Sequence, residues 1–427
     1  MTAAERIVAP IGGAHVEGAR KWVLVFSLAI VFFVLFALFA AILGVLLPNQ
    51  IQDLDPAGKT ATLGVVFAIT SVFSTIVTPV SGALSDRTRS RFGRRTPWIV
   101  LGSLIGGVAT ILIPHGGNIV GITALWVLAT ISLNSMLPAI TTVVADRFRP
   151  HERGTVSGVV GATMTAGLSA GTIFGGLMAS QMALAYAILG AGVIAACASF
   201  VLFNPEPPLP HDFAVPPPFR IGAFLRGFWI SPREHPDFAW AFFGRFSIYM
   251  GYQAILTYLL YILEDHIGLS QAEANAMIAR MSSVTLVALV ISSLSSGWLS
   301  DKLGRLKPLV FIAGLLMGLA VVAPLVSRTI PGMFGYAVLV GLGYGAFMSV
   351  DLALMTHVLP PRPAGEEATG KDLGILTTAI NIPQILSPVL AATLLSLTGN
   401  NYPLLFCLAA VFVLVGAAFV LPIRSVR

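Results

Sequence analysis

Residues 82–97 read GALSDRTRSRFGRRTP, and residues 297–308 read GWLSDKLGRLKP. Both stretches follow one apolar run and precede another, and both fit the pattern G-x-L-S-D-[R/K] followed by G-R-x-x-P. The first copy has four additional residues between its aspartate and its second glycine. A basic hairpin that occurs twice between apolar runs predicts a chain built as two similar halves.

The composition is that of a membrane protein. Hydrophobic residues make up 56% of the chain and charged residues only 10%, with a mean hydropathy of +0.87. Soluble domains carry about 25% charged residues, so a soluble enzyme is excluded. Runs near the roughly 20 residues that cross a bilayer recur along the whole chain, at 22–47, 60–83, 98–114, 119–144, 155–179, 182–203, 238–263, 274–299, 308–327, 332–358, 372–397 and 402–422. We therefore expect an all-α integral membrane protein with twelve transmembrane helices in two pseudo-symmetric six-helix bundles.

The basic residues predict the orientation. With the N-terminus in the cytoplasm, all of the 25 lysines and arginines except Lys59, Arg280 and Arg328 fall in or beside cytoplasmic segments. The positive-inside rule favours this topology, with both termini cytoplasmic. The net charge of +6 follows from this placement and gives no reason to expect a nucleic-acid partner. No apolar segment precedes Lys21, so we expect no cleaved signal peptide and a bacterial inner membrane as the location.

The two halves are separated by a proline-rich stretch. We expect a cytoplasmic N-terminal segment at 1–21, a first half at 22–203, a linker at 204–237, a second half at 238–422 and a cytoplasmic tail at 423–427. Residues 219–229 mix aromatic side chains with arginines, which is typical of a helix lying on a membrane surface.

Six plus six helices, a central cytoplasmic loop and this hairpin resemble the major facilitator superfamily of secondary transporters. The resemblance implies that the hairpin aspartates pack near helix starts of the opposite half, Asp86 near Lys371 and Asp301 near Arg153-Gly154. It assigns a gating role to Gly82, Asp86, Arg87, Gly93, Arg94, Arg95, Gly297, Asp301, Gly304 and Arg305. Hairpins that only enforce topology are the alternative.

Longer stretches resemble one branch of that superfamily. The loop 85–98, the element Asn381-Ile382-Pro383-Gln384, and the pairs Asp146-Arg147 and Arg153-Gly154 are similar to those of sucrose-type sugar:proton symporters. That branch is related to the glycoside–pentoside–hexuronide:cation symporters. The resemblance implies import of a sugar, a disaccharide or glycoside, together with protons by alternating access.

A proton-coupled drug or metabolite efflux antiporter is the alternative. Its marker is G-x-x-x-G-P-x-x-G-G, and residues 167–176 match it except at Thr172, where the marker has proline. Such antiporters also carry an arginine within the fourth helix, and 124–144 contains none.

Four predicted helices carry polar and aromatic side chains at helical spacing, as a sugar site in a water-accessible cavity requires. The candidates for substrate binding are Tyr249, Tyr252 and Gln253 in helix seven, Tyr344 in helix ten, Asn381 and Gln384 in helix eleven, and Trp126 and Asn134 in helix four. Each could instead be a polar contact between helices, worth about 0.6 kcal/mol.

Ionisable residues inside a membrane are costly, so they are functional candidates. Asp351 is the acidic residue well inside a predicted span, with Arg245 and Arg280 as candidate counter-ions or sugar ligands. We predict that Asp351 couples transport to protons; a structural salt bridge is the alternative. The interiors of helices one, two and four contain no acidic residue, so a sodium site there is not expected.

No catalytic or metal-binding motif occurs in the sequence, and Cys197 and Cys407 lie far apart within predicted helices. We therefore expect no enzyme activity, no cofactor and no metal. The expected partners are a small-molecule substrate, protons and the lipid bilayer, with the monomer as the functional form.

Overall fold

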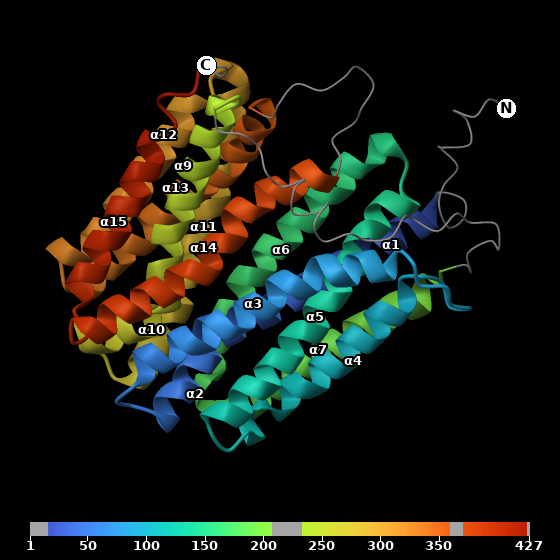
Figure 1. Ribbon diagram of the computed structural model, residues 1–427, viewed down its shortest axis with the longest axis horizontal. Helices are drawn as coiled ribbons and strands as arrows, with labels where there is room; N and C mark the ends of the chain where they lie inside the picture. Colours follow the sequence, from blue (N-terminus) through green and yellow to red (C-terminus); the bar gives the residue numbers. More distant parts are fainter. Residues whose placement is uncertain (1–15, 207–232, 359–369, 425–427) are drawn as a thin grey trace. The chain divides into compact units, whose positions relative to one another are not determined.

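The computed structural model describes residues 16–206, 233–358 and 370–424, and within these ranges all regular structure is helical (Figure 1). In the first part of the chain the helices are α1 (Ala19–Ala41), which continues through a π-helical turn (Ile42–Leu46) into α2 (Leu47–Leu54), α3 (Lys59–Ser85), α4 (Thr96–Leu112), α5 (Ile119–Arg147), α6 (Pro150–Met178) and α7 (Met182–Phe203). The later helices are α9 (Pro236–Thr257), α10 (Leu259–Tyr261) with the π-helical turn Ile262–His266, α11 (Gln271–Leu303), α12 (Lys307–Val326), α13 (Ile330–His357), α14 (Gly370–Leu397) and α15 (Tyr402–Ala418). The predicted surface helix at 219–229 lies outside the described residues.

Twelve helical segments can cross a membrane. Nine stretches of the described chain are long and apolar enough to cross a membrane, and one of these, His151–Phe203, contains both α6 and α7. The bent pair α9 and α10, with an angle of 57° between its parts, and the shorter α15 complete the set. The predicted fold class, all-α with twelve spans, is confirmed.

Helices α6 and α7 run in opposite directions, so the stretch that contains them is two spans. Gly167 and Gly171 on α6 lie against Phe33 and Ala37, in the same order along α1. Along α7 the contacts run in the opposite order. Tyr186, near its start, donates to Gln50 on α2, whereas Gly192, further along, lies against the earlier residue Val34 on α1. The short 3-10 turn Ala179–Gln181 is therefore a reversal of the chain.

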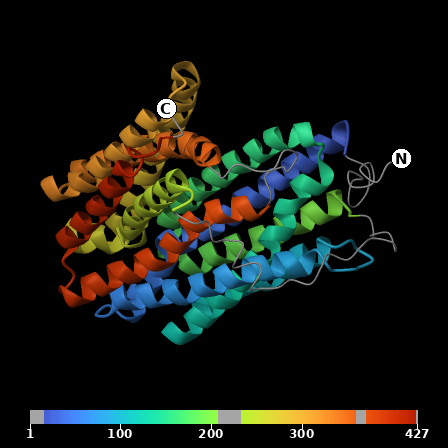
Figure 2. The ribbon, with the colours of Figure 1, turned by 45° about the horizontal axis from the view of Figure 1, so that its top comes forward.

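The chain divides into two compact units, which repeat one packing scheme. The described residues of unit 1 fall within 1–50 and 69–219, and those of unit 2 within 51–68 and 220–427. In unit 1, α1 packs on α6 and α7, and α4 packs on α5 and α7 (Figure 1, Figure 2). In unit 2 the corresponding helices form the same pairs, α9 with α14 and α15, and α12 with α13 and α15. The duplicated sequence motif thus marks a duplicated structure.

The two hairpins reach their helices by the same local chemistry. Gly93 and Gly304 both adopt a positive φ, of 89° and 58°, a region that glycine enters without steric cost. Pro97 and Pro308 then stand in the first turn of α4 and α12, where their missing N–H is not needed. The shared G-R-x-x-P pattern is therefore a turn followed by a helix start.

Glycines on α6 set its distance from α1. A Cβ added to Gly171 would stand 2.1 Å from the carbonyl oxygen of Ala37, whereas one added to Gly161 has nothing within 4 Å. We expect Gly171→Ala to destabilise the protein by about 1–3 kcal/mol, since backbone must move to make room. Gly161→Ala, on the same helix, should be neutral or stabilise by up to about 1 kcal/mol.

Thermal unfolding of the purified protein in detergent, followed by tryptophan fluorescence, compares the two variants. Equal melting temperatures for Gly171→Ala and Gly161→Ala would contradict the close contact between α1 and α6.

Candidate functional site

An ion pair lies inside unit 2, between α9 and α13. Nε of Arg245 stands 3.1 Å from Oδ2 of Asp351, and the two side chains are only 6% and 5% exposed. Although the atoms are at ion-pair distance, their geometry is not that of a hydrogen bond, and Nη1 of Arg245 has no partner either. Buried polar atoms without partners are rare in folded proteins, so this pair has unused capacity to bind a polar group.

Tyrosines from the same two helices surround the pair. The hydroxyl of Tyr249 lies 3.4 Å from that of Tyr344 and within 3.2 Å of the sulfur of Met348. The rings of Tyr252 and Tyr344 stack with centroids 4.8 Å apart and an interplanar angle of 14°. Together the two helices offer aromatic faces, hydroxyl groups and both signs of charge. The residues predicted separately in helices seven and ten are thus brought together.

A second polar row lies in unit 1, on one face of α5. Trp126, Thr130 and Asn134 follow one another at intervals of four residues, and all three are buried. The indole N–H of Trp126 and the hydroxyl of Thr130 have no hydrogen-bond partner, while Asn134 donates to the carbonyl oxygen of Thr130. The ring of Phe39 on α1 meets Trp126 edge to face, with centroids 6.2 Å apart. This row can therefore offer an aromatic ring and two free polar atoms to a ligand.

The other predicted site residues lie elsewhere. Asn381 and Gln384 are exposed on α14, and Arg280 is exposed on α11. Gln253 is half-buried and lies 3.3 Å from the hydroxyl of Thr257. Among the described residues, the cation that pairs with Asp351 is Arg245.

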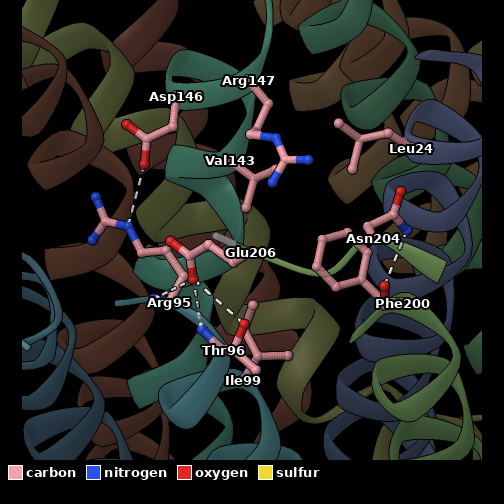
Figure 3. A pocket seen from close by; sticks show the side chains of 10 residues that line it. All are labelled: Leu24, Arg95, Thr96, Ile99, Val143, Asp146, Arg147, Phe200, Asn204 and Glu206. Carbon is pink, nitrogen blue, oxygen red and sulfur yellow. Dashed lines mark hydrogen bonds and ion pairs between the residues drawn. The ribbon is translucent and has the colours of Figure 1, made fainter. Parts of the chain in front are cut away.

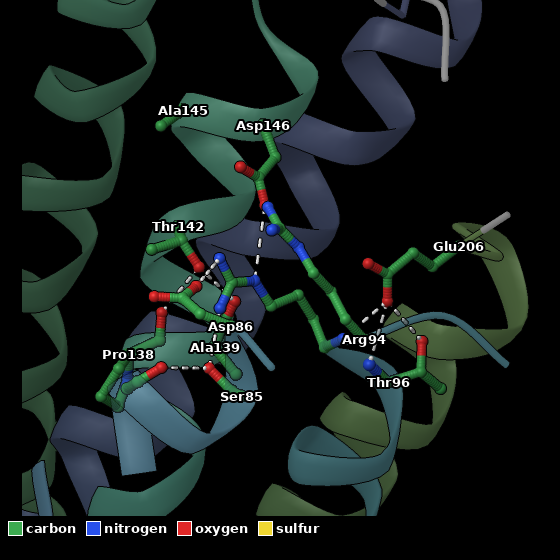
Figure 4. A network of polar contacts seen from close by, with 12 residues as sticks. Ser85, Asp86, Arg94, Thr96, Pro138, Ala139, Thr142, Ala145, Asp146 and Glu206 are labelled. Atoms are coloured by element: carbon green, nitrogen blue, oxygen red, sulfur yellow. Dashed lines mark hydrogen bonds and ion pairs between the residues drawn. The ribbon is translucent and has the colours of Figure 1, made fainter. Parts of the chain in front are cut away.

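The first hairpin forms a charge network at the ends of α3, α4 and α5 (Figure 4). Arg95 is buried and contacts Asp86 at 2.7 Å, Ser85 at 2.7 Å and Asp146 at 3.4 Å. Arg94 is also buried and meets Asp146 at 2.7 Å. In unit 1 Asp86 is therefore held by an arginine of its own hairpin.

Glu206, which follows α7, fastens the start of α4. One of its carboxylate oxygens accepts hydrogen bonds from the backbone N–H groups of Arg95 and Thr96, at 2.8 and 3.1 Å. A Cβ at Gly93 would stand 2.3 Å from the same oxygen. A carboxylate at a helix N-terminus is stabilised by the unpaired N–H groups and by the helix dipole.

These residues line a crevice in unit 1 (Figure 3). Its polar side carries Arg95, Asp146, Arg147 and Glu206, and its apolar side is formed by Leu24, Ile99, Val143 and Phe200.

The remaining motif residues are less constrained. A Cβ at Gly82 would make ordinary contact with Pro138 at 3.4 Å, and one at Gly297 would stand 3.1 Å from the hydroxyl of Ser349. Gly82 is therefore not required for close approach within unit 1.

Arg87 is half-buried and Arg305 is exposed. Arg153 donates to the carbonyl oxygens of Ala145 and Phe148 in its own unit. The side chains of Asp301 and Lys371 lie outside those that the structure describes.

Sequence reasoning gave no role to Glu206, and Asp146 entered only as part of a family pattern. Glu206 lies more than one hundred positions from the amides that it binds, as the separations of 110 and 111 residues show. Its only local signal is a carboxylate just beyond the end of an apolar run, which is not specific. Thr130, by contrast, stands between Trp126 and Asn134 at helical spacing, and the sequence therefore places it in the same row as these two candidates.

Two repeated bundles with buried polar clusters define a membrane transporter fold. The sequence profile of the Major Facilitator Superfamily matches residues 24–366 and 241–427, so the chain belongs to this superfamily of transporters.

Three known proteins illustrate the similarity. Multidrug resistance protein 2 of Bacillus subtilis (strain 168) is 26% identical over 379 residues, which cover 86% of this chain and 89% of that protein. An uncharacterized symporter of Synechocystis sp. is 48% identical over 65 residues, 14% of this chain and 12% of that one. The crystal structure of a mutant of the nucleoside transporter NupG has a TM-score of 0.71 at 13% identity, covering 94% of this chain and 99% of that one. This last likeness concerns the fold alone.

The Glu206 contact makes a local prediction. In Glu206→Ala the amides of Arg95 and Thr96 lose their acceptor, so they should exchange with solvent deuterium faster, and stability should fall by about 1 kcal/mol. Glu234→Ala, at an exposed carboxylate before α9, should change neither quantity. Hydrogen exchange with mass spectrometry on peptides covering the start of α4 measures the effect; unchanged exchange in Glu206→Ala would contradict it.

Proposed function

We propose that this transporter imports a neutral sugar or glycoside together with protons, with Asp351 as the proton-binding carboxyl and Arg245 as its counter-ion. The observation that carries the proposal is the buried Arg245–Asp351 pair, whose polar atoms are incompletely bonded and which stands beside stacked tyrosines. Burying an ionised carboxylate is costly unless a partner compensates it. When a substrate oxygen takes over Arg245, Asp351 loses that compensation and accepts a proton.

The side chains around the pair suit a sugar. The faces of Tyr252 and Tyr344 can cover the apolar face of a pyranose ring, and the hydroxyl of Tyr249 can bond to a sugar hydroxyl. Trp126 and Asn134 of unit 1 remain proposed substrate contacts in their own right, because the indole N–H of Trp126 and the neighbouring Thr130 hydroxyl have no hydrogen-bond partner. Asn381, Gln384 and Gln253 lie outside this cluster, and in this proposal they remain further substrate contacts because they are polar side chains on helices of the same unit.

Two sequence features support the branch. The long form of the first hairpin resembles that of sucrose-type symporters, and the Synechocystis relative is named a symporter, though its substrate is not part of that name. We assign the first hairpin, with Asp86, Arg94 and Arg95, to gating, because its ion pairs fasten three helix ends that must move during alternating access.

We also propose that the end of unit 1 with this arginine-rich network faces the cytoplasm of a bacterial cell, as the positive-inside rule favours. Both termini then lie on that side, and the outer ends of α3 and α9–α10 face the outside.

Proton-driven efflux is the second candidate. The similarity to Multidrug resistance protein 2 extends over most of both chains and favours it. The glycines at 167–176 favour it less, since those at 167, 171 and 175 are explained by contact with α1.

Proteoliposomes with an internal pH dye test the proposal. Sucrose, maltose or a related disaccharide added outside should acidify the interior, and in Asp351→Asn this acidification should fall to the leak rate. Exchange of labelled sugar should persist in Asp351→Asn, because the neutral variant resembles the protonated carboxyl.

Glu234→Gln is the control and should behave as the parent protein. Full sugar-driven acidification in Asp351→Asn would refute the role of Asp351. Proton movement driven by a lipophilic cation, without any response to sugars, would establish efflux instead.

A further inference from the structure

A charge cluster lies in unit 2, away from the Arg245–Asp351 pair. Nζ of Lys59, at the start of α3, stands 3.2 Å from the carboxylate of Glu264 and 2.9 Å from that of Asp265. It also lies 3.3 Å from the side-chain oxygen of Gln52 and 4.7 Å from the ring centroid of Tyr261. A single ammonium group therefore serves two carboxylates.

The two acidic residues are adjacent in sequence and lie in the π-helical turn Ile262–His266. The turn follows the 57° bend at the end of α9, and its hydrogen bond from Ile267 to the carbonyl of Ile262 spans five residues. Such turns in otherwise α-helical segments occur frequently at functional sites.

The two carboxylates are not equivalent. Asp265 has a second partner, because the hydroxyl of Tyr402 donates to it at 2.6 Å. The side chain of Glu264 is only 8% exposed, and its Oε1 has no hydrogen-bond partner although Oε2 meets Lys59. Lys59, Glu264 and Asp265 together carry one excess negative charge when both carboxylates are ionised. A proton bound at Oε1 of Glu264, which is buried and unpaired, would remove that charge.

We propose that Glu264 is a second proton-binding site, and that its protonation loosens the outer end of α3 from the helices that it contacts within unit 2. The proposal uses the orientation given above, in which this end faces outside, and does not depend on the nature of the transported substrate.

Lys59 is one of several contacts that fasten this end of α3. The hydroxyl of Thr60 lies 3.1 Å from the side-chain oxygen of Asn400, and that of Tyr258 lies 3.2 Å from the carbonyl oxygen of Thr60. A Cβ at Gly64 would be 2.4 Å from that of Ala392, so α3 and α14 touch here. These other contacts involve no charged group. The ion pair between Lys59 and Glu264 is therefore the contact at this end of α3 that acid can weaken.

The charged and titratable groups that face Glu264 come from every neighbouring element. They are Lys59 on α3, Tyr261 on α10 and Tyr402 on α15, while Asp265 and His266 share its turn and Asp53 on α2 faces Tyr261. Lys59 is the cation paired with Glu264 among the described residues. Protonating Glu264 therefore weakens the hold on Lys59, whereas the ionised form maintains it.

Labelling of a cysteine at the fastened end tests this. In a Cys407→Ser background, which removes the exposed native thiol, Thr60→Cys is reacted with a membrane-impermeant maleimide in right-side-out vesicles. Each rate is divided by that of the unfolded protein at the same pH, which removes the intrinsic pH dependence of the thiol. The normalised rate should rise about fivefold when the external pH falls from neutral to mildly acidic, as expected when Lys59 keeps only one of its two ion pairs.

Adding Glu264→Gln should give the high rate at both pH values, since the uncharged amide, like the protonated carboxyl, leaves Lys59 with Asp265 as its one ion-pair partner. Asp55→Asn, in the loop between α2 and α3, is the matched control. Hydrogen bonds from the Thr62 hydroxyl and the Gly58 amide hold the pKa of Asp55 below its ordinary value, so Asp55 stays ionised in mild acid and should leave the response intact.

A pH response that persists in Glu264→Gln would overturn the proposal, as would a response to the internal pH alone. The labelling needs no substrate. Its result therefore stays valid even if the proteoliposome experiment shows that the protein does not transport sugars.

Discussion

The requirement that every buried polar group find a partner within the protein governs this structure. In a bilayer no water is at hand to replace a missing hydrogen bond, so the backbone forms helices throughout the described chain. Side chains meet the same requirement at helix starts and hairpins, as Glu206 does for the amides of Arg95 and Thr96. Among the described residues, buried side-chain atoms without a hydrogen-bond partner occur in three places: on α5, between α9 and α13, and at Glu264. Because such atoms are rare in folded proteins, these places are candidates for functional sites.

The two halves meet one structural need with opposite charges. In the first hairpin the start of α4 receives the carboxylate of Glu206, which follows α7. In the second, Lys307 stands where Thr96 stands in the first, and its ammonium group donates to the carbonyl oxygen of Leu421, in the turn that follows α15, at 2.9 Å. The carboxylate at the start of α4 complements the helix dipole, whereas the ammonium group at the start of α12 is held by backbone carbonyl oxygens beyond α15. The duplicated sequence therefore preserves which helices are joined but not how.

Sequence patterns predicted what depends on local spacing. Apolar runs defined the twelve spans. Helical spacing selected Tyr249 and Tyr344, and a charge inside a predicted span selected Arg245 and Asp351, and these four residues meet in unit 2. Contacts between distant residues could not be predicted, because no periodicity links Glu206 to α4 or Glu264 to α3. The contacts of Lys59 could not be predicted either. The sequence showed only that Lys59 is one of the few basic residues outside the predicted cytoplasmic segments.

That exception has a physical explanation, and it bears on how such a transporter can move. In the proposed orientation Lys59 lies on the outer side and opposes the positive-inside rule, but two carboxylates compensate its charge. Ion pairs at the helix ends are partly open to water, with Asp86 45% and Asp265 32% exposed. Pairs of this kind contribute only up to about 1 kcal/mol, so they can break and re-form as the helix ends separate. The Arg245–Asp351 pair lies deep in the protein, where separating the charges without a replacement is costly. In the proposed mechanism, therefore, the pairs at the helix ends break readily, whereas Arg245 and Asp351 separate only when a ligand or a proton replaces the lost partner.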